Sequence, residues 1–280
     1  MWLFTGVAIG FTICSVLVWR RRAEVGLKEA YELVQAGLPN ETELVQAAAR
    51  RFEQRQAGAI VGGWLGGISA LVVFASQGSP IIGLLWSGLI GTFGVAVANC
   101  VFHFRAVRAA RRDGPRLARL GQRRLRDYLI WPEIVAQYGE LVLPLVTAAV
   151  GVRVLTGQDE PRTGWALLGA GVAGVLICGI AHVLQRKVLA LSQPASGESE
   201  LRWAEALRAA TLRDLSDMMM WACWFLGGAT IIAVDLPSGL PSFVEPLSYV
   251  LFCGGIAVLV GARLSGSGKW GLRRSQRAIG

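Results

Sequence analysis

Charged side chains are scarce in this sequence. They make up 17% of its 280 residues, whereas hydrophobic residues make up 53%. A soluble domain usually carries about 25% charged residues. The shortage of charge excludes a disordered chain, a coiled coil and an ordinary cytosolic enzyme. The composition therefore predicts an integral membrane protein that crosses the bilayer several times.

Histidine is nearly absent, and the motifs of common enzymes are missing. The two histidines, His103 and His182, leave few ways to build a histidine-based site. Neither H-E-x-x-H nor G-x-S-x-G occurs in the chain. Residues 169–174 and 266–271 match G-x-G-x-x-G, but neither stretch follows a predicted strand, so neither indicates a nucleotide site. We predict that the protein is not an enzyme.

The cysteines are too dispersed for a disulfide framework or a zinc site. Each of the five lies in an apolar run, and no two have CxxC spacing: Cys14, Cys100, Cys178, Cys223 and Cys253. We interpret them as small buried side chains. The sequence therefore predicts no cofactor and no metal site.

Lysine and asparagine are rare as well. The chain has 3 lysines against 25 arginines, and only 2 asparagines. Lysine and asparagine have AT-rich codons, whereas arginine, glycine and alanine have GC-rich codons. This usage indicates a GC-rich bacterial genome, and it predicts that the protein lies in the bacterial cytoplasmic membrane.

Seven apolar runs have about the 20 residues that a helix needs to cross a bilayer. The fourth is the weakest, because it contains Glu140 and Arg153 and is interrupted by Pro144. Proline is tolerated in such a helix where a neighbour satisfies the carbonyl that it frees. The sequence predicts one all-α membrane domain over residues 1–280, with seven transmembrane helices near 2–19, 58–76, 80–104, 134–155, 163–185, 218–236 and 246–264.

The basic residues predict which way the chain lies in the membrane. Nothing basic precedes the first run, and Arg20, Arg21 and Arg22 follow it. Of the 28 lysines and arginines, 26 fall at 20–55, 105–126, 186–213 and 263–277. Loops rich in lysine and arginine stay in the cytoplasm. We therefore predict an outside N-terminus and an inside C-terminus, with cytoplasmic segments at 20–57, 105–133, 186–217 and 265–280.

This layout consists of one N-terminal helix followed by three helical hairpins with basic cytoplasmic connecting segments. The short matches QRRLRD at 122–127 and AATLRD at 209–214 suggest a threefold repeat, with chance similarity as the alternative. Within the first basic segment we predict a helix over 23–36, ended by Gly37-Leu38-Pro39, and a second helix that starts after Asn40.

Two features of the chain predict its partners. The basic segment 105–126 carries interspersed leucines and can lie on anionic lipid headgroups at the cytoplasmic face; the alternative is a solvated segment that only sets the topology. Gly58, Gly62 and Gly66 recur every four residues, which allows close helix contact in lipid. We favour contact within one bundle over a homodimer or another membrane-protein partner. The basic residues follow the inner helix ends, so nucleic acid is not a predicted partner.

A few polar side chains gather at the predicted inner ends of the middle helices. His103 and His182 end the third and fifth helices, Glu140 lies near the start of the fourth, and Asn99 is one turn from His103. Such groups could share a proton or bind a small solute, with a divalent metal as a lesser alternative. The alternative is that they reach the membrane interface without any role. We predict this cluster as the candidate binding site.

The sequence leaves two functions open. Its outer half offers little polarity beyond Thr147, Arg153 and Thr230. A permease needs a polar path across both leaflets, whereas a scaffold does not. We therefore expect a non-enzymatic subunit or scaffold that docks membrane or cytoplasmic partners, with a small-solute or ion permease as the alternative.

Overall fold

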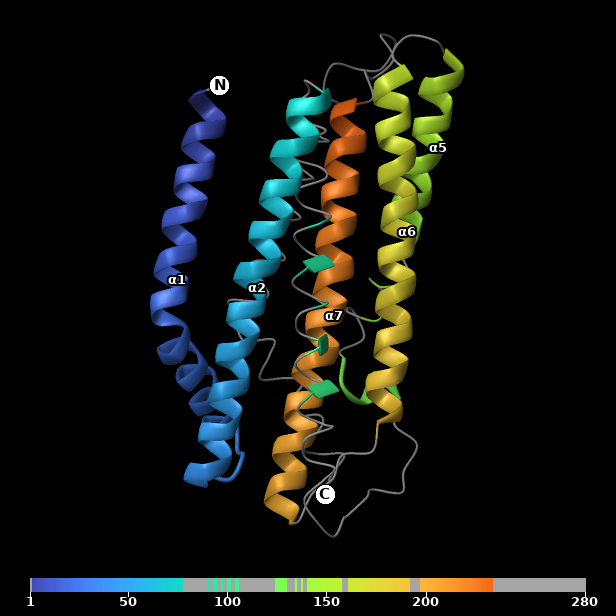
Figure 1. Cartoon of the computed structure of the whole chain (residues 1–280). Helices are drawn as coiled ribbons and strands as arrows, with labels where there is room; N and C mark the ends of the chain where they lie inside the picture. Colours follow the sequence, from blue (N-terminus) through green and yellow to red (C-terminus); the bar gives the residue numbers. More distant parts are fainter. Residues whose placement is uncertain are drawn as a thin grey trace, which may run out of the picture.

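The computed structural model (Figure 1) consists of long helices that run side by side. It describes residues 2–77, 90, 93–94, 97, 100–101, 104–105, 124–129, 134, 137, 140–157, 161–191 and 197–233. Every regular element in these residues is helical, which confirms the all-α class for that part of the chain. The predicted helix at 246–264, most of the one at 80–104 and most of the basic segment 105–133 fall outside the described residues.

Helices α1 (Trp2–Gln35) and α2 (Thr42–Gln77) form an antiparallel hairpin. The sequence predicts separate membrane and cytoplasmic helices on each arm, but the structure joins each pair into one helix. Charge alone does not end a helix, because arginine, glutamate and alanine are good helix formers. At the boundaries predicted at residues 19 and 57 the side chains therefore change from apolar to charged, but the helical backbone continues.

The turn between α1 and α2 confirms the predicted stop at Gly37. This glycine has a φ of 107°, in the left-handed region that favours glycine. Its N–H donates to the carbonyl of Val34 at 2.9 Å, and the N–H of Leu38 donates to the carbonyl of Leu33 at 3.2 Å. These two bonds satisfy the last carbonyls of α1 in a Schellman motif, and Leu38 and Leu33 pack in the same apolar cluster.

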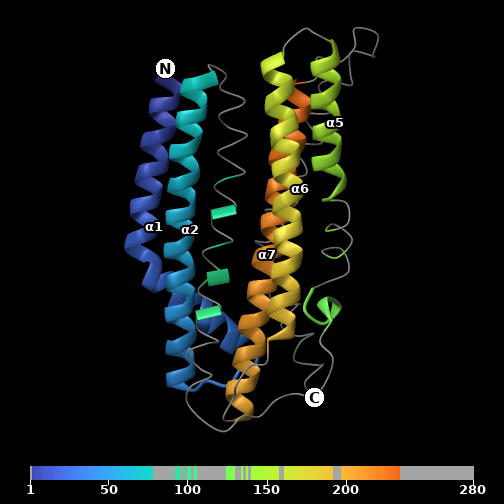
Figure 2. The same cartoon turned by 45° about the vertical axis from the view of Figure 1, so that its right-hand side comes forward.

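Helices α5 (Val142–Gly157) and α6 (Pro161–Ala190) form a second hairpin, shown in Figure 2. Glycine brings their backbones together: a Cβ at Gly171 would lie 2.6 Å from the amide nitrogen of Ala148 and 2.7 Å from the carbonyl oxygen of Pro144.

A Cβ at Gly94 would lie 2.9 Å from the Cα of Gly62. Gly62 therefore makes a contact within the chain, of the kind favoured from the glycine spacing.

The long helix α7 (Glu198–Ala233) packs against α6, α5 and α2. Its first part falls in the predicted cytoplasmic segment 186–217 and the rest in the predicted membrane helix 218–236, and the two are again one helix. Residues 212–214, which repeat the Leu-Arg-Asp of 125–127, lie within α7, whereas Leu125–Asp127 is a short 3₁₀ helix. The repeated triplet therefore has two different structures.

The helices divide into two halves along their length. The charged half comprises the described residues of 20–57, 124–129, 186–191 and 197–217, and the apolar half comprises those of 2–19, 58–77, 134–157, 161–185 and 218–233. Large apolar side chains are exposed on four helices of the apolar half: Val16, Leu17 and Trp19 of α1, Val61, Trp64, Leu65 and Ile68 of α2, Val142, Leu143, Leu145, Val146 and Val152 of α5, and Trp165, Val172, Leu176, Ile180 and Val183 of α6.

Among the described helices, α6 is long and apolar enough to cross a membrane by length and composition, and α5 is apolar but shorter. This observation supports an association with a membrane without establishing seven spans. The predicted fourth helix, 134–155, needs one correction. Ile134 and Gln137 are helical, but Glu140 and Leu141 form a turn, and α5 begins at Val142.

Candidate functional site: a polar seam between α5 and α7

The turn at Glu140 follows from Pro144, four residues later. Proline has no N–H to give to the carbonyl of the residue four positions before it, and its ring crowds that carbonyl. The carbonyl of Glu140 is therefore free of a helical partner, and the thiol of Cys223 in α7 donates to it at 2.8 Å. The sequence predicted that a neighbour would satisfy this carbonyl but did not indicate Cys223.

Two further hydrogen bonds join the same segment to α7. The side-chain amide of Gln137 donates to the hydroxyl of Ser216 at 2.9 Å. The hydroxyls of Thr147 and Thr230 lie 2.8 Å apart, and Thr147 is fully buried. Ser216, Cys223 and Thr230 recur every seven residues, so they share one face of α7. We call this row of contacts, from Gln137–Ser216 through Glu140–Cys223 to Thr147–Thr230, the polar seam.

The structure describes only half of the predicted polar cluster. Glu140 is buried at 7% exposure, and its Oε2 has no hydrogen-bond partner. His182 is half-buried on α6, one position from the buried Ala181, and makes no hydrogen bond or ion pair with Glu140. His103 and Asn99 lie outside the described residues, so their convergence on Glu140 stays a prediction.

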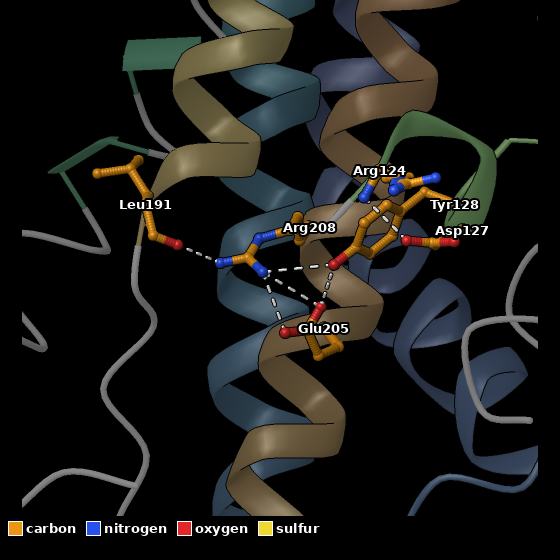
Figure 3. A network of polar contacts seen from close by, with 6 residues as sticks. All are labelled: Arg124, Asp127, Tyr128, Leu191, Glu205 and Arg208. Carbon is orange, nitrogen blue, oxygen red and sulfur yellow. Dashed lines mark hydrogen bonds and ion pairs between the residues drawn. The ribbon is translucent and has the colours of Figure 1, made fainter. Parts of the chain in front are cut away.

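A second buried polar group lies in the charged half, where Figure 3 shows Arg208 of α7 surrounded by partners. Arg208 is fully buried, and its Nη1 donates to Glu205 Oε1 at 3.0 Å. Its Nη2 donates to the carbonyl of Leu191 at the end of α6, at 2.5 Å. The hydroxyl of Tyr128 donates to Glu205 Oε2 at 2.6 Å. We call these four residues the arginine cluster.

The arginine cluster connects three separate parts of the chain. Tyr128 follows the 3₁₀ helix, Leu191 follows α6, and Glu205 and Arg208 lie on α7. Burial and the hydrogen bond to Glu205 raise the pKa of Tyr128 to about 12. The phenol therefore stays neutral at physiological pH and acts as a donor to the carboxylate. A buried pair of this kind contributes mainly by fixing geometry.

A third group of charges holds α1, α2 and α7 together. Arg55 of α2 pairs with Glu29 of α1 at 2.6 Å and with Asp214 of α7 at 3.5 Å. Burial lowers the pKa of Arg55, but Asp214 and Glu29 outweigh it and raise that pKa above its usual value. Arg22 and Glu53 form another α1–α2 pair at 2.9 Å. These carboxylates balance the arginines, so the group is structural and not an anion site.

The described residues show no arrangement typical of an enzyme. No group of three or more histidine, cysteine, aspartate or glutamate residues within the described ranges could hold a metal ion. A pocket between Arg51, Phe52 and Thr211 has a volume of about 20 Å³. This volume is about that of one water molecule.

Sequence reasoning missed most of the buried polar residues. Ser216 and Gln185 were not singled out, Cys223 was predicted to be buried but not to form a hydrogen bond, and the pair Glu205 and Arg208 has the i, i+3 spacing of an ordinary exposed helix pair. The spacing of Ser216, Cys223 and Thr230 is the one signal that could have revealed the seam. No known protein family, no curated protein and no solved structure matches the chain.

Proposed function

We propose that the chain is a seven-span protein of the bacterial cytoplasmic membrane, with its N-terminus outside and its C-terminus inside. The exposed apolar side chains support this placement. Trp165, Leu176 and Leu145 are 65%, 60% and 59% exposed, and further large apolar residues surround them on α5 and α6. A contiguous apolar surface of this kind is rare on a soluble monomer but suits contact with lipid.

We propose further that the protein is a non-enzymatic subunit or scaffold. The observation that carries this proposal is the packing of the charged half. Its helices have a core of their own, formed by α1, α2 and α7: Ala30, Leu38, Val45, Ala48, Phe52, Trp203 and Ala206. Together with the ion pairs of Arg55, this core gives the cytoplasmic side a rigid helical platform on which a partner can dock.

One face of α1 is suited to such docking. Leu27 and Tyr31 lie one turn apart in the charged half and are 42% and 48% exposed. Exposed apolar pairs at this spacing are typical contact points for an amphipathic partner helix. Lys28 lies between them and adds a charge beside the apolar contact.

Site-specific photo-crosslinking in cells tests the docking role. We expect a crosslinker at Tyr31 to give a discrete product with a second protein, and a crosslinker at the exposed Gln46 of α2 to give none. Leu27→Glu should abolish the product, because it places a charge in the apolar contact. Crosslinking that is equal at both positions, or insensitive to Leu27→Glu, would contradict docking at this face.

The polar seam favours the second candidate, a small-solute or ion permease. Gln137–Ser216 lies toward the charged half and Thr147–Thr230 lies deep in the apolar half, so polar contacts extend through much of the bundle. Solute flux into vesicles that contain the purified protein tests it. Flux that disappears in Thr147→Val would support the permease over the scaffold.

A further inference from the structure

Glu140 and Gln185 are two of the side chains in the bundle that are buried with an atom lacking a hydrogen-bond partner. Glu140 has Oε2 unbonded at 7% exposure, and Gln185 of α6 has Nε2 unbonded at 3% exposure. Buried polar groups are almost always hydrogen-bonded, and each exception needs an explanation. An unpaired carboxylate is the costlier of the two, because burying a charge without a partner is strongly unfavourable.

Among the residues that the structure describes, no positive charge lies against Glu140 to offset a carboxylate. Within the described ranges, the titratable side chains that face it are two thiols, Cys178 from α6 and Cys223 from α7. Cys100, in the third predicted helix, belongs to the same buried cluster. Among the described residues, no lysine, arginine or histidine pairs with Glu140. With the described partners alone, a proton or a bound cation would have to neutralise a carboxylate at this position.

The chemistry of the neighbours favours the proton. Hard cations such as Ca²⁺ and Mg²⁺ take about six oxygen ligands. The described side chains near Glu140 offer thiols, and the Cys223 thiol already donates to its carbonyl. A proton requires no further ligand, and a neutral carboxyl is much cheaper to bury than its ionised form.

We propose that Glu140 is a proton-binding site within the membrane, reached from the cytoplasmic side through Gln137, Ser216 and Gln185. Gln137 is three residues before Glu140, and Gln185 is two helical turns past Cys178 toward the charged half. These groups provide polar steps between Glu140 and the charged half. The Thr147–Thr230 pair continues the seam on the other side of Glu140. This inference rests on the proposed membrane placement and not on the docking role.

Labelling with dicyclohexylcarbodiimide tests the proposal on the full-length protein in lipid vesicles. This apolar reagent takes the proton of a neutral carboxyl on one nitrogen, and the carboxyl oxygen then bonds to its central carbon. The adduct rearranges to a stable N-acylurea, with no leaving group. We expect peptide mass spectrometry to find the adduct at Glu140 and not at the exposed Glu198 or Glu43.

The pH dependence and the variants sharpen the test. Above the point at which Glu140 loses its proton, the rate should fall about tenfold for each pH unit. Glu140→Gln should remove the adduct, and Gln137→Leu should slow its formation at least severalfold by blocking the polar approach. If Glu140→Gln fails to fold, mapping of the adduct in the unchanged protein still decides.

Three results would overturn the proposal: no adduct at Glu140, a rate independent of pH between about 5 and 10, or faster labelling by a water-soluble carbodiimide than by the apolar one. The last result would place Glu140 in water. None of them affects the crosslinking at Tyr31, so failure of the proton site and failure of the docking role are distinguishable.

Discussion

The two halves of the bundle bury polar groups in different ways. In the charged half, a buried ion pair within α7, Arg208–Glu205, makes hydrogen bonds to two distant parts of the chain, at Tyr128 and Leu191. In the apolar half, single hydrogen bonds from small side chains accompany close backbone contact, as in Thr147–Thr230 and at Gly171. The comparison indicates that buried charged groups hold the helices of the charged half in place, whereas close backbone packing holds those of the apolar half.

The largest effect should come from breaking the arginine cluster. Arg208→Met leaves Glu205 as an uncompensated buried charge, so we expect a loss of about 3–5 kcal/mol in the free energy of unfolding. Thermal unfolding in detergent, followed by circular dichroism, measures the change. The double variant Glu205→Met with Arg208→Met should recover most of it, because it removes both charges.

The exposed pair Arg202 and Glu198 on the same helix is the matched control for this comparison. Its atoms are closer, at 2.6 Å, but the side chains are 42% and 70% exposed. Arg202→Met should therefore change stability by less than about 1 kcal/mol. Equal effects of the two arginine substitutions would show that burial is not what distinguishes the arginine cluster.

The second effect concerns backbone contact in the apolar half. Gly171→Ala places a Cβ 2.6 Å from the backbone of Ala148, which cannot move aside easily. We expect a loss of about 1–3 kcal/mol, the usual range for overpacking. Gly179→Ala on the same helix is the control, since its Cβ would meet nothing within 4 Å. Equal stability of the two variants would contradict the claim that close backbone packing holds the apolar half together.

The third effect is a pH dependence that arises from Tyr128 in the charged half. The pKa of Tyr128 is raised to about 12 by burial and its bond to Glu205, whereas a free phenol has a pKa of about 10. The unfolded chain therefore loses this proton first as the pH rises. The contribution of Tyr128 to the free energy of unfolding is complete below about pH 10 and disappears as the pH rises toward 12. The loss should be smaller in Tyr128→Phe, and unfolding temperatures of both proteins across this range measure it.

The smallest effect should come from the single hydrogen bond between α5 and α7. Thr230→Val removes the partner of Thr147, and side-chain bonds between membrane helices average about 0.6 kcal/mol with a maximum near 1.7. Thr156→Val, at the exposed end of α5, should have no measurable effect. A loss as large as that of Arg208→Met would erase the contrast between the halves.

Much of this fold could be predicted from the sequence, because local rules decide it. The turn at Gly37 requires a left-handed backbone, and Pro144 frees a carbonyl wherever it lies in a helix. The length of α1, α2 and α7 could not be predicted, since the charged residues that end each apolar run do not end the helix. The seven spans themselves stay a prediction.

The buried polar groups could not be predicted, because their burial depends on distant parts of the chain. Glu205 and Arg208 resemble Glu198 and Arg202 in spacing, and only Tyr128 and the end of α6 make them different. The fate of Glu140 depends likewise on Cys223, 83 residues away. The sequence pattern shows which residues share a face of a helix, but it does not show which distant segment packs against that face.

The most direct test of the account is the side of the membrane on which each end of the bundle lies. Single cysteines at Thr156 and Glu198 would be placed in a chain whose Cys223 is replaced by serine, which keeps a donor for Glu140, and whose other cysteines are replaced by alanine. We predict that a membrane-impermeant maleimide labels position 156 in intact cells and position 198 only after the membrane is permeabilised. Labelling of position 198 in intact cells would contradict the central claim.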